Sequence, residues 1–203
     1  WLESAAASLH ASSPIVDTHL HCFAGAADPR FPYHVKAPYR PEEAATPQWL
    51  LKCMRRASVN GAVVVHPEPY QDDHRYLEYC LAQDRKRLRG TCLFFADRTG
   101  SVDKMAGLVD RTGEQLIATR LHAYAPDRLP PFGTPELAHY WKMATDLGLA
   151  MQLHFEPRYA PGLEPYIKQF PKTTVIIDHM GRPMQGTKEE HDVVVRWARF
   201  PNT

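Results

Sequence analysis

The sequence predicts an α/β protein of the (β/α)8 TIM-barrel class. Short apolar runs alternate with helical stretches, at a spacing that is typical of βα units. The runs are almost continuously apolar, as expected for parallel strands that are covered on both faces. A doubly wound sheet is the alternative, but the first run ends in His19 and His21, where a dinucleotide-binding fold would have a glycine-rich turn. We therefore expect a barrel.

Six apolar runs are the predicted strands. They are Ile15–His21, Ala62–His66, Gly90–Phe95, Leu116–His122, Leu149–His154 and Thr174–His179. A closed barrel has eight strands in about 250 residues, so we expect this chain of 203 residues to lack the last two βα units. We divide it into a disordered or processed lead-in, residues 1–13, and an incomplete barrel domain with strands one to six, residues 14–203.

Helix signals lie between the strands. The first two expected helices are Arg75–Leu88, which Gly90 closes, and Ser101–Thr112, which Ser101 caps. The next is Glu136–Leu147, which follows Thr134 and Pro135. The last is Val193–Phe200, which follows a capping box at Thr187–Glu190. The basic run at residues 85–89 falls at the end of the first of these helices, where cations favour the helix dipole. Residues 28–47 form a long connection rich in Pro and Tyr, which we expect to line a substrate cleft.

Composition excludes several classes of protein. The net charge is +1, so no global field attracts the chain to nucleic acid or to an anionic membrane surface. No apolar run approaches the roughly 18 residues of a membrane span. Four scattered cysteines without a C-x-x-C spacing indicate reduced, mostly buried thiols. We expect an intracellular, cytoplasmic protein, with an organellar location after N-terminal processing as the alternative.

The main functional signal is histidine at the ends of three strands. Asp17, His19 and His21 alternate along the first strand and so share one face. His154 and His179 end two later strands. Because barrel enzymes carry their sites at the carboxyl ends of the strands, these imidazoles are expected to converge, either on a metal or on a substrate carbonyl.

Other polar residues follow the strands. Arg120 shares its face with His122, and a charge inside a strand indicates an anion-binding or carboxylate-pairing role. Arg182 follows Asp178 and His179 in a Gly-Arg-Pro turn and is a candidate carboxylate clamp, with a structural salt bridge as the alternative.

For further residues near the strand ends, a role in the site and a structural role remain equally open. Tyr124 is either a substrate hydrogen-bonding group or a packed ring, and His66, Glu68 and Glu156 either line the cleft or stabilise loops. Asp178 and His179 are adjacent, so either one of them packs behind the strand or both diverge at the strand end.

These motifs, in their order and spacing, resemble the amidohydrolase superfamily, and within it the amidohydrolase-2 branch with its pyrone-dicarboxylate lactonases and sugar lactonases. The resemblance covers residues 14 to 200. The matching segments are Val16–His21, Phe31–Pro41, Gly61–Pro67, Arg89, Arg120, Met151–His154 and Ile177–Pro183.

The resemblance implies a hydrolase that opens a small carboxylate-bearing lactone, of the 2-pyrone-4,6-dicarboxylate or sugar-lactone type, with water. The catalytic residues would be His19, His21, His154 and His179, and the substrate-binding residues Arg120, Arg182 and Tyr124. The cofactor would be absent, or one divalent metal (Zn or Mn) on His19, His21 and His154. The fourth strand has no lysine for a binuclear site, and the aspartate base of an eighth strand has no counterpart.

Two other functions stay open. One is a mononuclear-metal hydrolase or decarboxylase of the same superfamily. The other is a non-catalytic barrel subunit, because an open barrel exposes strand edges that a protein partner or self-association would cover. The expected ligand is a small anionic lactone in the first case, and we expect neither nucleic acid nor a membrane as a partner.

Overall fold

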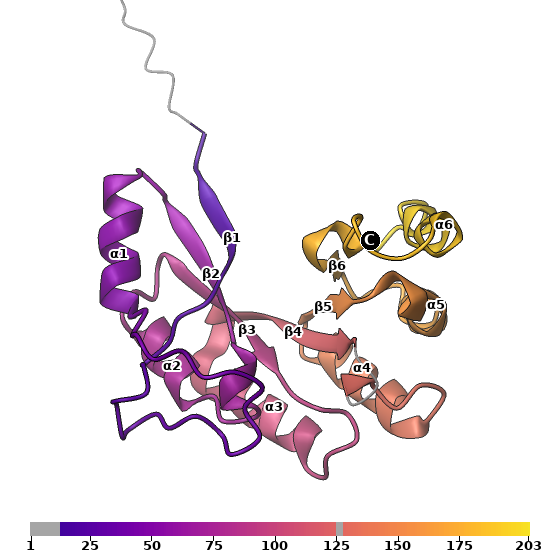
Figure 1. The fold of residues 1–203 in the computed structure, drawn as a ribbon. Helices are drawn as coiled ribbons and strands as arrows, with labels where there is room; N and C mark the ends of the chain where they lie inside the picture. The colour runs from indigo at the N-terminus through magenta and orange to yellow at the C-terminus, as the bar shows by residue number, and fades with distance from the viewer. Residues whose placement is uncertain (1–12, 125–127) are drawn as a thin grey trace, which may run out of the picture.

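A computed structural model describes residues 13–124 and 128–203. Six parallel strands form one sheet in the order β1-β2-β3-β4-β5-β6. The strands are β1 (Val16–Leu20), β2 (Gly61–Val65), β3 (Leu88–Leu93), β4 (Leu116–Ala123), β5 (Ala150–Phe155) and β6 (Val175–Ile177). The sheet curls into a half barrel with its helices on the outer side and with β1 and β6 at its two edges (Figure 1). The predicted fold class is confirmed, and the lead-in, apart from Ser13, lies outside the described residues.

Helices connect the strands along the outer side of the sheet. They are α1 (Pro47–Arg56), α2 (Arg75–Ala82), α3 (Ser101–Thr112), α4 (Pro135–Asp146), α5 (Ala160–Gln169) and α6 (Lys188–Trp197). The core fills the space between helices and sheet, with Trp141, Tyr140 and Trp197 completely buried there. In the described parts of the chain, no helix combines the length and the apolar character needed to cross a membrane.

The predicted helix Arg75–Leu88 is too long. Asp84 ends α2 early, because its Oδ1 accepts hydrogen bonds from the backbone N–H groups of Lys86 and Arg87 at 3.1 and 3.0 Å. The basic run therefore occupies a turn and the start of β3 and does not lie at a helix end. Gly90 lies inside β3, where a Cβ would come within 2.9 Å of a Leu81 methyl group, so this glycine allows α2 to pack closely on the sheet.

The helix caps give one confirmation and one correction. The capping box is present as predicted, with the Glu190 N–H donating to Thr187 Oγ1 at 3.3 Å and the Thr187 N–H donating to Glu190 Oε2 at 2.9 Å. Ser101 does not cap α3. It is the first residue of the helix, and its hydroxyl donates to the Phe95 carbonyl at 2.6 Å.

The connection after β1 folds back over the end of β2. The backbone groups of Phe23 and Ala45 exchange hydrogen bonds of 2.9 and 2.8 Å, which close the segment between them as a loop. The His34 N–H donates to the Pro69 carbonyl at 2.9 Å and holds the middle of this loop. The four cysteines are unpaired, and Cys22, Cys80 and Cys92 are buried, as the sequence predicts.

Candidate active site

The four histidines that the sequence singles out lie together at the carboxyl ends of the strands. The ring of His19 is 5.2 Å from that of His21 and 4.9 Å from that of His179, measured between centroids. The ring of His154 is 5.3 Å from that of His179. His122 extends the row, because its ring lies 5.2 Å from that of His154. We call these five residues the histidine cluster.

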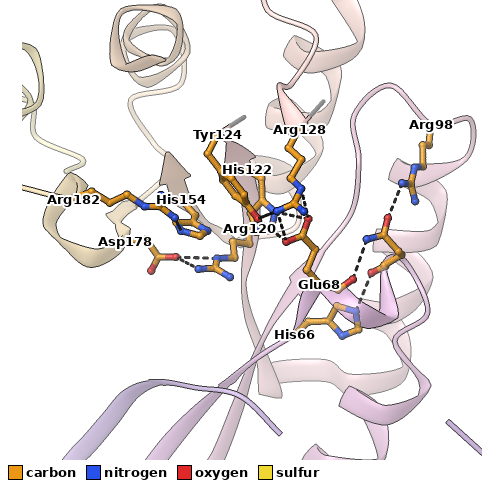
Figure 2. A network of polar contacts seen from close by, with 11 residues as sticks. His66, Glu68, Arg98, Arg120, His122, Tyr124, Arg128, His154, Asp178 and Arg182 are labelled. Atoms are coloured by element: carbon orange, nitrogen blue, oxygen red, sulfur yellow. Dashed lines mark hydrogen bonds and ion pairs between the residues drawn. The ribbon is translucent and has the colours of Figure 1, made fainter. Parts of the chain in front are cut away.

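Asp178 is the buried anion at the base of this cluster. Arg120 donates to its Oδ2 from Nε at 2.8 Å and from Nη2 at 2.6 Å (Figure 2). Gln152 donates to Oδ1 at 2.6 Å, and His19 Nδ1 lies 3.1 Å from the same oxygen. Burial alone would raise the pKa of Asp178, but the hydrogen bond from His19 and the charge of Arg120 hold that pKa well below its ordinary value.

A left-handed turn brings His179 to the site beside Asp178, which already lies on the strand face of Gln152. Strand β6 ends at Ile177, and His179, Met180 and Arg182 then adopt φ values of 50°, 53° and 55°. Because the backbone leaves the extended conformation here, the two neighbouring side chains do not alternate. The open question of their direction is thereby answered: the alternation stops at the strand end, and both side chains face the site, so neither packs behind the strand.

Hydrogen bonds fix the protons on two of the imidazoles. His21 donates from Nδ1 to the Val65 carbonyl at 2.7 Å, which leaves the lone pair on Nε2. His154 accepts from Arg182 Nη2 at Nε2, at 2.5 Å, so its proton is on Nδ1. Burial lowers the pKa of His21 to about 4, and burial with the charge of Arg120 lowers the pKa of His154 to about 2. Both rings are therefore neutral at pH 7.

The three predicted substrate-binding residues lie near the histidine cluster, and each of them has different partners. The sequence predicts either an anion-binding or a carboxylate-pairing role for Arg120. The structure shows carboxylate pairing, because Arg120 forms an ion pair with Asp178 of the same chain. Arg182 binds His154 and lies 5.3 Å above the ring of Tyr124. The ring of Tyr124 is 4.8 Å from that of His154. The roles of these three residues toward a substrate stay predictions.

A second buried carboxylate, Glu68, lies on the other side of His122. Tyr124 donates its hydroxyl proton to Glu68 Oε2 at 2.5 Å, and Arg128 Nε lies 3.3 Å from Oε1. His122 Nδ1 is 3.8 Å from the same carboxylate. Burial would raise the pKa of Glu68, but the interactions with His122 and Tyr124 hold it below the ordinary value.

Two further residues whose roles the sequence left open support loops. His66 is fully buried, donates from Nε2 to the Gln71 carbonyl at 2.9 Å, and stacks on His74 at 4.1 Å. Glu156 forms an ion pair with Arg158 after β5. The sequence also gave no role to Gln152, although its position two residues before His154, on the same strand face, could have indicated one.

In the described part of the chain, three groups are placed to hold a metal ion together. One ligand atom each from His19, Asp178 and His179 lies within 4.8 Å of the others. His19 Nε2 is buried and has no hydrogen-bond partner among the described residues. Two imidazoles and a carboxylate suit Zn or Mn. This group shares His19 with the predicted metal set and does not include His21 or His154.

These features define a barrel of the α/β class that carries its polar site at the carboxyl ends of parallel strands. The family model for amidohydrolases, of the amidohydrolase-2 branch, matches residues 16–203, and the chain belongs to this family. No curated protein sequence matches the chain significantly.

Solved structures show the same fold. One is a probable 2-pyrone-4,6-dicarboxylic acid hydrolase from Acinetobacter baumannii with bound citric acid (TM-score 0.75, 22% identity, covering 91% of this chain and 66% of that one). Another is an amidohydrolase from Burkholderia multivorans with bound zinc (TM-score 0.69, 14% identity, covering 94% of this chain and 68% of that one). The chain thus spans about two thirds of the length of these proteins.

Proposed function

We propose that the protein is a hydrolase that opens a small, carboxylate-bearing lactone with water. The observation that carries this proposal is the row of neighbouring imidazoles around the buried Asp178, with the cation Arg182 beside it. Membership of the amidohydrolase family and the fold shared with a probable pyrone-dicarboxylic acid hydrolase support it.

In the proposed reaction, His19 acts as the base. Asp178 accepts the Nδ1 proton of His19, which leaves the Nε2 lone pair facing away from the carboxylate. Such a neutral imidazole, oriented by a buried carboxylate, takes a proton from water as the water oxygen attacks the lactone carbonyl. The ring C–O bond then breaks, and the proton passes to the departing alkoxide to give a hydroxy acid.

In this proposal, Arg182 and His154 stabilise the negative charge that develops on the carbonyl oxygen. Arg182 donates one N–H to His154 and retains other donors of its guanidinium. The Nδ1 proton of His154 has no partner among the described residues and is a second donor. Donors of this kind, fixed before the reaction, contribute about 10²- to 10³-fold to the rate per group.

A metal-dependent hydrolase or decarboxylase is the second candidate, because His19, Asp178 and His179 are placed as ligands. A bound ion would supply a Lewis acid and an activated water. Elemental analysis of the purified protein tests this candidate, with stoichiometric Zn or Mn expected if it holds.

The test of the main proposal is turnover of a lactone panel by the complete protein, followed as acid release. The panel contains 2-pyrone-4,6-dicarboxylate and several aldonolactones. Ring opening that His19→Gln abolishes supports the proposal. No turnover of any lactone, with or without added Zn or Mn, would remove it.

A further inference from the structure

A cavity of about 360 Å³ lies beside the histidine cluster and has no part in the reaction proposed above. It is located at the ends of β2, β3 and β4, and His122 and Glu68 line it. Figure 2 shows these two residues between His154 on one side and Arg98, another lining residue, on the other. The volume is that of a small-molecule site.

The walls of the cavity combine apolar and polar residues. Leu93, Phe94, Leu121 and Leu129 line it together with charged and polar residues that include Glu68, Asp97 and His122. The loop after β1 contributes Lys36 and Pro38, so the long connection does line a cavity next to the cluster. A ligand group that extends from the cluster past His122 would enter this cavity, where it would meet both apolar and charged residues.

Arg98 is a guanidinium held ready for an anion. Its Nη2 donates to Gln71 Oε1 at 2.9 Å, and the guanidinium carbon lies 3.6 Å above the ring of Phe95. Its Nη1 is 3.5 Å from Asp72, whose other oxygen accepts from Lys104 at 2.6 Å. Because Asp72 is shared between two cations and a guanidinium has five donors, Arg98 keeps both charge and N–H groups for a ligand.

Gln71 holds Arg98 in this position through a strained backbone. Its φ and ψ are 53° and −119°, a conformation that L-residues rarely adopt, and the residue is buried. Its carbonyl accepts from His66, and its side-chain amide donates to the Glu68 carbonyl at 2.9 Å. A strained backbone conformation that several hydrogen bonds maintain indicates that the position of Gln71 is important for binding.

Arg98 shares Asp72 with Lys104, whereas in the described part of the chain the other arginines near the cavity have carboxylates that no second lysine or arginine shares. Arg120 is paired with Asp178, and Arg128 with Glu68. Arg98 and Lys36 are therefore the cations of this region best placed to bind an anionic group that a ligand brings in.

We propose that this cavity is a subsite for an anionic group that the substrate carries at the end of a short chain. Arg98 is the specificity-determining residue, and Lys36 assists it. This inference rests on the proposed function and names its substrate class: a lactone whose substituent ends in a carboxylate or a phosphate, separated from the reacting carbonyl by the length of the cavity.

Matched substrates test this subsite. A series of δ-lactones with carboxyalkyl side chains is compared with the corresponding carboxamides and phosphate monoesters, in the native protein, in Arg98→Gln and in Arg75→Gln. Arg75 is the control because it is an exposed arginine that is paired with Asp73 outside the cavity. We expect Arg98→Gln to raise KM for an anionic substrate about 10- to 100-fold, the effect of one charge-assisted hydrogen bond, with kcat and the carboxamide kinetics unchanged. The better of the two anions identifies the group.

Equal losses on anionic and neutral substrates would overturn the subsite, and so would no loss on either. Titration calorimetry with adipate and with neutral adipamide separates this result from failure of the proposed function. Adipate binding that Arg98→Gln abolishes, without turnover of any lactone, keeps the subsite and removes the lactonase. Turnover without anion preference keeps the lactonase and removes the subsite. The absence of both turnover and adipate binding overturns both.

Discussion

The site contains two buried carboxylates, and each of them has an arginine and a histidine beside it. Asp178 binds Arg120 at 2.6 Å and His19 at 3.1 Å. Glu68 lies 3.3 Å from Arg128 and 3.8 Å from His122. The side chain of Arg120 is 5% exposed and that of Arg128 is 30% exposed.

The difference follows from where the two sets of residues lie. Arg120 comes from inside β4, and its geometry is fixed by the sheet. Arg128 lies in the loop after β4, next to a cavity. Chemistry requires groups held to a fraction of an ångström, whereas binding tolerates adjustment. We therefore assign the reaction to the Asp178 side and substrate selection to the Glu68 side.

The largest expected difference between the two sides concerns their histidines. His19→Gln removes the proposed base, and we expect kcat for lactone hydrolysis to fall about 10²- to 10⁴-fold, the usual contribution of a general base. His122→Gln is expected to change KM much more than kcat. Steady-state kinetics of both variants on the best lactone measures this. Equal losses of kcat in the two variants would contradict the assignment of the reaction to the Asp178 side and of substrate selection to the Glu68 side.

The next difference concerns stability. Asp178→Ala leaves Arg120 buried without its partner, and we expect a loss of about 3–5 kcal/mol in the free energy of unfolding. Glu68→Ala leaves Arg128 in contact with water and is expected to cost about 1 kcal/mol. Urea denaturation measures both values. Asp178→Asn, which keeps the shape of the side chain, is the control for the lost packing. A larger loss for Glu68→Ala than for Asp178→Ala would contradict the assignment of the rigid side.

The next prediction concerns the pH dependence of stability. It tests the contribution of buried His66, which supports the loop on the Glu68 side. Burial lowers the pKa of His66 from 6.5 to about 4 in the folded protein. The unfolded chain therefore binds this proton at a higher pH, so the contribution of neutral His66 is complete above pH 6.5 and is lost as the pH falls toward 4. We expect a loss of about 3 kcal/mol over this window. Urea midpoints between pH 7 and 4 measure it.

A matched pair of variants tests whether His66 causes this pH dependence of stability. His66→Asn is expected to flatten the pH dependence, and His139→Asn is the control at an exposed histidine. Burial also lowers the pKa values of His74, which stacks on His66, and of His21 and His154, so part of the slope remains in His66→Asn. An unchanged slope in His66→Asn would show that this ring titrates normally.

The strands and the histidine cluster could be predicted because both depend on short-range patterns. Each strand is an apolar run, and parallel strands bring their carboxyl ends to one rim, which places His19, His154 and His179 together. Helix α1 is absent from the predicted helices although the sequence contains a start signal for it, the capping residue Thr46 followed by Pro47. Helix α5 carries a contrary signal, Pro165, which packing overrides.

The parts that the sequence could not give depend on backbone conformations without a residue signature. His179 reaches the site beside Asp178 only because His179 and Met180 adopt left-handed conformations that these residues rarely adopt. Gln71 likewise has positive φ without being glycine. Such conformations are imposed by surrounding contacts, and a single sequence does not reveal them.

The smallest expected effect concerns what covers the turn that holds Asp178. Helix α6 lies against it, because a Cβ on Gly181 would come within 3.0 Å of a Val194 methyl group. Thr187→Ala removes the cap of α6, and we expect a loss of about 1 kcal/mol in stability. Since α6 contacts the Asp178 side, kcat should fall slightly, while Arg98-dependent anion binding stays unchanged. Thr187→Ser, which keeps the capping oxygen, is the control. A change in anion binding in Thr187→Ala would mean that the two sides are coupled and do not divide the reaction from substrate selection.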